Sequence, residues 1–150
     1  MRGVLAVSFC GVVLWGLLII FLKIFRRAYN EIDEKYGKPY QAKLVKMIGG
    51  HPGLKRGSMV ISLHPKDAIA FNRKVFLLSQ ISSIKIISEL PEVYKNNSQA
   101  AVSSGSEDQY LRLEVTDEYG QHEVIFTTKS DFKKIANPLL QKWNRYNLQV

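Results

Sequence analysis

The sequence contains few of the side chains that catalysis and metal binding need. It has one cysteine and three histidines among 150 residues. A single cysteine, Cys10, excludes an intrachain disulfide. The histidines, His51, His64 and His122, have no partner at metal-ligand spacing, because the sequence has neither a His-Glu-x-x-His motif nor a cysteine pair. We therefore expect no metal and no cofactor, and we expect the histidines to be solvated turn residues.

Catalytic motifs are also missing. No Gly-x-Ser-x-Gly elbow occurs, and the glycine-rich stretch at residues 49–57 lacks the Gly-Lys-Ser/Thr ending of a phosphate-binding loop. One group of carboxylates lacks the alternating spacing and central glycine of a calcium loop, and we interpret it as a solvated acidic face. Its members are Glu107, Asp108, Glu114, Asp117 and Glu118. These absences predict that the protein is not an enzyme.

Positive charge is concentrated toward the N-terminus. The net charge is +8 overall, with +9 in residues 1–90, −4 in residues 91–129 and +3 in residues 130–150. Such a gradient fits a protein held against anionic lipid headgroups. Nucleic-acid binding is the competing use of a basic surface, but no base-reading motif and no arginine-rich run is present. We expect no nucleic-acid partner.

The first segment is strongly apolar. The run from Val4 to Phe25 contains one charge, Lys23, and as a helix it would be about 33 Å long, which matches a bilayer core of about 30 Å. It is longer than a signal-peptide core and has no small-x-small cleavage site at its end. The pattern predicts an uncleaved transmembrane anchor over residues 1–25. Lys23, Arg26 and Arg27 are the expected membrane-interface residues, and they place the C-terminal domain in the cytoplasm, at the plasma membrane.

A helix is expected to continue to Tyr36, where Gly37 and Pro39 provide a stop. Residues 26–42 would then be a juxtamembrane helix and linker. Beyond it the hydrophobic period becomes two, which predicts short strands. Their expected ranges are 43–48, 59–63, 68–71, 75–78, 84–90, 111–116 and 123–127.

The last segment has a helical apolar stripe. Its members are Phe132, Ile135, Ala136, Leu139, Leu140 and Trp143. Pro138 lies inside it and predicts a kink or a restart. An amphipathic helix that follows seven strands most simply plugs an open barrel. The alternative is a membrane-surface helix whose polar residues lie at the interface. The expected cationic and aromatic members of that interface are Lys133, Lys134, Lys142, Trp143 and Arg145.

The fold class expected is therefore α+β, mainly β: an N-terminal transmembrane helix, then a seven-stranded antiparallel barrel or sandwich closed by a C-terminal helix. Residues 44–71, "LVKMIGGHPGLKRGSMVISLHPKDAIAF", and 76–87, "FLLSQISSIKII", resemble small bacterial pleckstrin-homology-like (PH-like) or GRAM-type domains. The resemblance covers about residues 43–146. It implies a binding module without chemistry of its own, which recognises phosphoinositides or protein segments near membranes.

The resemblance also directs attention to the first two strands and their loop. Phosphoinositide-binding relatives carry a Lys-(x)n-Lys/Arg-x-Arg pattern there, and this chain offers Lys46, Lys55 and Arg56 but places Met59-Val60-Ile61 where the last arginine is wanted. The missing arginine argues against specific inositol-phosphate recognition, whereas diffuse attraction to anionic lipid remains. The following turn adds Arg73 and Lys74 to the candidate lipid- or partner-binding residues.

The leading hypothesis is a single-pass membrane protein whose cytoplasmic PH-like domain acts as an adaptor or scaffold. Its partner would be another membrane protein, and anionic lipid headgroups would be a second contact. The alternative is an accessory subunit of a membrane complex that acts mainly through its transmembrane helix.

Overall fold

The computed structural model describes residues 2–95, 109–128 and 131–149; for residues 2–14, 24, 25, 28 and 95 it describes the backbone alone. The chain divides into two compact units, Met1–Lys35 and Tyr36–Val150. The stretch at residues 96–109 is small, polar and without hydrophobic periodicity, which predicts a loop between strands; it lies almost wholly outside the described residues.

The first unit is helical. Helix α1 runs from Arg2 to Tyr36, so the predicted helix end at Tyr36 is confirmed. Gly37 follows with φ of +82°, a conformation that L side chains resist and that suits the residue after a helix. Arg26 and Arg27 are exposed on α1. The Nε atom of Arg27 lies 3.7 Å from Oε1 of Glu31, one turn further along the helix.

The predicted transmembrane anchor is corrected by the structure. In the part of the chain that the structure describes, no helix is long and apolar enough to cross a membrane. The described side chains of α1 begin at Trp15, and the apolar stretch that starts there ends at Lys23. On this finding, the predictions of a transmembrane helix and of a single-pass membrane protein are wrong. Residues 4–14 of the predicted anchor lie outside the described side chains. The alternative hypothesis of an accessory subunit is not tested by this finding and stays a prediction.

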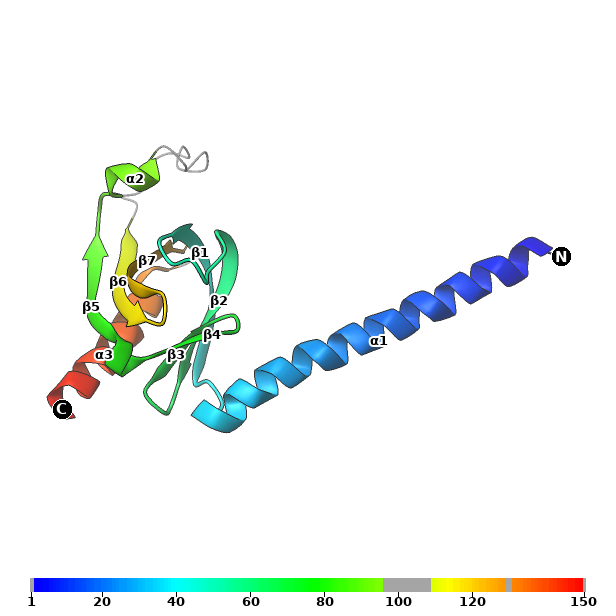
Figure 1. Cartoon of the computed structure of the whole chain (residues 1–150), viewed down its shortest axis with the longest axis horizontal. Coiled ribbons are helices and arrows are strands. Elements are labelled where there is room, and N and C mark those ends of the chain that lie inside the picture. Colours follow the sequence, from blue (N-terminus) through cyan, green and yellow to red (C-terminus); the bar gives the residue numbers. More distant parts are fainter. Residues whose placement is uncertain (1, 96–108, 129–130, 150) are drawn as a thin grey trace. The chain divides into compact units, whose positions relative to one another are not determined.

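The second unit contains a seven-stranded antiparallel sheet with the order β4-β3-β2-β1-β7-β6-β5 (Figure 1). The seven predicted strands are confirmed, with ends shifted by a few residues. Their bounds are β1 Gln41–Gly49, β2 Gly57–His64, β3 Ala68–Phe71, β4 Lys74–Leu77, β5 Ile81–Ile87, β6 Tyr110–Asp117 and β7 Gly120–Thr127.

The prediction of a barrel or sandwich closed by the C-terminal helix is wrong, because the strands form one sheet that does not close. Strands β4 and β5 are the two edges of the sheet and do not pair with each other. The chain passes from one to the other through a short 3-10 helix, η1 Leu78–Gln80, which turns the backbone before a ladder can form. Strand β4 has four residues, and all of them pair with β3. The sheet therefore remains open between its edge strands β4 and β5.

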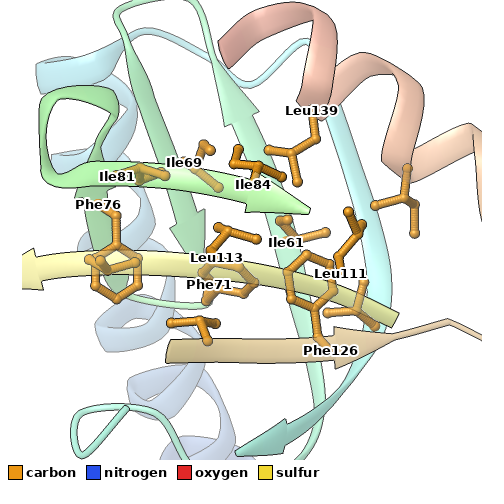
Figure 2. Packing of buried hydrophobic residues seen from close by; sticks show 14 of the residues in the cluster. Ile61, Ile69, Phe71, Phe76, Ile81, Ile84, Leu111, Leu113, Phe126 and Leu139 are labelled. Atoms are coloured by element: carbon orange, nitrogen blue, oxygen red, sulfur yellow. The ribbon is translucent and has the colours of Figure 1, made fainter. Parts of the chain in front are cut away.

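The core lies between the inner face of the sheet and helix α3 Lys133–Gln149 (Figure 2). Strand residues alternate as predicted, so that Leu111, Leu113 and Val115 of β6 are all buried. From α3, Ile135 and Leu139 are buried in the same core. The predicted stripe is thus confirmed, and the helix is continuous with Pro138 inside it, so the predicted restart is wrong.

A smaller apolar cluster lies apart from this core. It is formed by Leu90, Tyr110 and Ile125, with Ile48, Ile87 and Tyr94 packed against it. Tyr94 comes from the one-turn helix α2 Glu92–Lys95, which follows β5. The cluster anchors the segment that leaves β5.

Candidate functional site

Three connections of the sheet meet at one end of it: the β1–β2 loop at residues 50–56, the β3–β4 turn at residues 72–73 and the β6–β7 turn at residues 118–119. Antiparallel pairing places them together, because β1, β3 and β6 end on the same side. The ring of His51, from the β1–β2 loop, packs against β4 and the β6–β7 turn, since its centroid lies 5.1 Å from that of Phe76 and 5.6 Å from that of Tyr119. We call this region the loop end.

A buried polar network holds the loop end together. The Nε2 atom of His51 lies 2.9 Å from Oδ2 of Asp117, and the ammonium of Lys74 lies 3.0 Å from the same oxygen. The side chains of His51 and Asp117 are 0% and 3% exposed, so this pair is shielded from solvent. Lys74 also donates to Glu118 at 3.0 Å. The Asp117 carboxylate, which precedes the β6–β7 turn, thereby joins His51 of the β1–β2 loop to Lys74, which follows the β3–β4 turn.

The hydrogen bonds assign the tautomer of His51. The backbone N–H of Gly53 donates to Nδ1 at 2.9 Å, so this nitrogen must carry a lone pair. The proton of the neutral ring is therefore on Nε2, where it is donated to the Asp117 carboxylate. Both ring nitrogens are engaged and the ring is buried. The His51–Asp117 pair consequently orients the loop and does not present a base to an external substrate.

The electrostatics of Asp117 favour its charged form. Burial raises the pKa of the Asp117 carboxyl, but the Tyr119 amide, the Lys74 ammonium and the His51 ring donate hydrogen bonds to it and lower the pKa to about 2. Burial lowers the pKa of the Lys74 ammonium. The hydrogen bonds and negative charges of Asp117 and Glu118 raise this pKa by more, so the net shift is upward. The Lys74 ammonium thus lies between two carboxylates and favours the charged form of Asp117.

The glycine-rich stretch at residues 49–57 has a steric explanation. Gly50 has φ of +116°, and a Cβ placed on it would lie 1.6 Å from the carbonyl oxygen of Glu123 in β7. The ring of Tyr94 lies over the neighbouring Gly49, 3.0 Å from where a Cβ would be. The paired glycines therefore allow close approach of backbone and ring at the point where β1 becomes the loop.

The predicted lipid- or partner-binding residues divide into two groups. Lys55 and Arg56 are exposed on the β1–β2 loop, and Arg73 is exposed on the β3–β4 turn, so the loop end brings these three together. Lys74 is at the same end, but its ammonium is bound to Asp117 and Glu118. Lys46 is half-buried within β1, opposite Ser58 and Thr127. The exposed cations of the loop end are therefore Lys55, Arg56 and Arg73.

The histidines differ from the sequence-based expectation of solvated turn residues. His51 is 4% and His64 is 1% exposed, so for these two the expectation is wrong. The ring of His64 donates from Nδ1 to the carbonyl of Gly37 at 2.7 Å and lies 3.1 Å from the Ser62 hydroxyl. It fixes the linker against β2. The third, His122, bonds to the Tyr119 carbonyl at 2.7 Å.

The interpretation of the acidic residues as a solvated face is wrong for Asp117, whose side chain is buried in the network. Glu107 and Asp108 lie outside the described residues. No sequence signal pointed to the His51–Asp117 pair, because its members are 66 positions apart and belong to no motif.

Across the described ranges, no group of three or more histidine, cysteine or carboxylate side chains is arranged to hold a metal ion. The loop end instead consists of exposed cations on connections that a buried network fixes. The resemblance of residues 44–71 and 76–87 to PH-like domains stays a prediction. The chain matches no protein-family model, no curated protein and no solved structure.

Proposed function

We propose that residues 36–150 form a PH-like binding module without catalytic activity. In this proposal the module acts as an adaptor, attaching to anionic lipid headgroups through the loop end and engaging a protein partner elsewhere on its surface. The strand order β4-β3-β2-β1-β7-β6-β5, followed by one C-terminal helix, supports the PH-like assignment. An apolar core that is complete within residues 36–150 supports an independent module.

One observation carries the lipid contact. Lys55 and Arg56 are exposed on a loop whose position is fixed by the buried bonds of His51 to Gly53 and Asp117. A loop with fixed ends loses little conformational freedom when it binds, so more of the electrostatic attraction appears as affinity. Each cation near an anionic bilayer contributes about 1 kcal/mol of attraction. Because the contact is electrostatic, it should weaken as the salt concentration rises.

Vesicle sedimentation of residues 36–150 tests this proposal without any contribution from α1. We expect sedimentation with phosphatidylserine-containing vesicles at low salt, little with phosphatidylcholine alone, and a large loss in the double variant Lys55→Glu/Arg56→Glu. The matched control is Lys43→Glu/Lys85→Glu, which makes the same change in net charge at exposed positions on β1 and β5. If sedimentation falls equally in both double variants, net charge explains the binding and the loop end is not a specific contact. If the wild type does not sediment, the proposal of lipid contact is refuted.

A further inference from the structure

A polar cleft lies away from the loop end, between the second half of α3 and the turn that joins β2 to β3. Its volume is about 260 Å³. The walls include Tyr40, Pro65 and Pro138, and the charged groups are Asp67, Lys142 and Arg145. Because β2 begins at the loop end and runs away from it, the cleft is near the opposite end of the sheet. The two sites therefore share no residue.

Lys142 is held in this cleft by the fold. Its ammonium donates to the backbone carbonyl of His64 at 2.6 Å and lies 5.8 Å from the centroid of the Tyr40 ring. His64 is itself fixed by its bond to Gly37. Burial lowers the pKa of Lys142, and the charge of Asp67 opposes this effect. A half-buried cation with one carbonyl partner retains donors that point to other groups.

Arg145 lies one turn further along α3, on the same wall of the cleft. It is exposed, and among the residues described no carboxylate is within ion-pair distance of its guanidinium. The pKa of the nearby Tyr40 hydroxyl is raised by burial, and the positive charge of Arg145 lowers it in part. Asp67 is the acidic residue among those lining the cleft, so two cations face one anion. The lining carries a net charge of one positive unit.

We propose that this cleft binds a carboxylate side chain, glutamate or aspartate, presented by an extended segment of the partner protein. The proposal rests on the proposed function, since it takes the partner to be a protein and names where it is recognised. One excess positive charge matches a carboxylate, whereas a phosphate monoester carries about two negative charges near neutral pH. Guanidinium binds carboxylate through two parallel hydrogen bonds. Tyrosine and proline walls offer apolar contact to the residues that flank the acidic side chain.

The test measures binding of a labelled peptide to the full chain in a mild non-ionic detergent. The probe is a fluorescein-labelled octapeptide, Gly-Ser-Pro-Glu-Tyr-Pro-Ser-Gly, compared with its glutamine-for-glutamate counterpart by fluorescence anisotropy. We expect the glutamate peptide to bind at least about tenfold more tightly, as loss of one hydrogen-bonded charge pair implies. We expect Arg145→Gln to remove most of that difference and Arg145→Lys to keep part of it. Lys133→Gln, an exposed cation at the other end of α3, is the matched control and should change nothing.

Asp67→Asn is expected to increase peptide binding, a result that a misfolded variant would not give. Removing this carboxylate leaves two cations unopposed, so the glutamate peptide should bind several-fold more tightly. Absence of glutamate-dependent binding, or equal effects of Arg145→Gln and Lys133→Gln, would overturn the proposal. So would a phosphoserine peptide that binds more tightly than the glutamate peptide, or a loss of vesicle sedimentation in Arg145→Gln, which would assign the cleft to phosphate or lipid. If Lys55→Glu/Arg56→Glu abolishes sedimentation while peptide binding is unchanged, the two sites are separate, and either proposal can fail without the other.

Discussion

The two ends of the sheet use charge in opposite ways. At the loop end, Lys74 is bound by two carboxylates and Asp117 by two donor side chains, and the side chains of His51 and Asp117 are buried. In the cleft, Lys142 and Arg145 face one carboxylate, and neither forms an ion pair with it. Charges that satisfy one another within a fold hold its segments in place, whereas charges left over are available to a ligand. The buried network is therefore structural, whereas the cations of the cleft, like the exposed Lys55 and Arg56 of the loop end, are available to a ligand.

The largest effect is expected from Gly50→Ala. The new Cβ would fall 1.6 Å from the Glu123 carbonyl oxygen, so β1 and β7 must separate at the bulge between Met47 and Gly49. We expect a loss of more than about 4 kcal/mol in the free energy of unfolding, or failure to fold. Urea titration of residues 36–150, followed by the fluorescence of Trp143, measures it.

Gly57→Ala is the matched control for this substitution. Gly57 has φ of +114°, almost the same as Gly50, but nothing lies within 4 Å of its Cβ position. It should cost about 1 to 2 kcal/mol from backbone strain alone. If both substitutions cost the same, backbone conformation rather than close packing explains the paired glycines, and the loop end is less crowded than the structure indicates.

The contrast between these glycines shows where sequence-based prediction ends. The strands followed from local alternation, as in Leu111, Leu113 and Val115, and α3 followed from its apolar stripe, because such patterns are carried by neighbouring residues. The glycines suggested a turn, which is also a local property. That Gly50 touches β7 depends on a pairing across the whole domain, and no local pattern encodes it.

The sites were less predictable than the fold for the same reason. Exposed cations such as Lys55 were identified by residue type, but the sequence did not reveal that Lys74 is neutralised by Asp117. The cleft joins Tyr40 to Arg145, which are far apart in the chain, and it exists only after α3 packs on the sheet. The barrel or sandwich was predicted from seven short, closely spaced strands, but whether a sheet closes depends on pairing between its edge strands, here β4 and β5, which do not pair.

The second largest effect is expected from Asp117→Asn. The substitution removes the negative charge that faces Lys74 and His51 in a buried position, and we expect a loss of about 2 to 3 kcal/mol in the free energy of unfolding. Glu118→Gln is the control, because Glu118 binds the same ammonium but its side chain is 70% exposed, so it should cost less than about 1 kcal/mol. Equal costs for the two substitutions would contradict a structural role for the buried network.

Lowering the pH should reduce the difference in the free energy of unfolding between the wild type and Asp117→Asn. The pKa of Asp117 is lowered from 3.8 to about 2 in the folded protein, so its charge stabilises the fold at pH values above its ordinary pKa. This stabilisation is lost as the pH falls from about 4 through about 2, where the folded-state carboxyl becomes protonated. Unfolding titrations of both proteins at several pH values in this range measure the narrowing. A difference that stays constant down to pH 2 would show that the charge of Asp117 does not contribute.

The smallest effect on stability is expected from the cleft. Arg145→Gln removes an exposed cation that has no carboxylate within ion-pair distance in the described part of the chain, so the free energy of unfolding should change by less than about 0.5 kcal/mol. The same substitution is expected to remove most of the glutamate-dependent peptide binding. Asp117→Asn is expected to lower the free energy of unfolding strongly and to leave peptide binding unchanged at temperatures where the variant is folded. If Arg145→Gln proves as destabilising as Asp117→Asn, the cations of the cleft also serve the fold, and the contrast between the two ends of the sheet disappears.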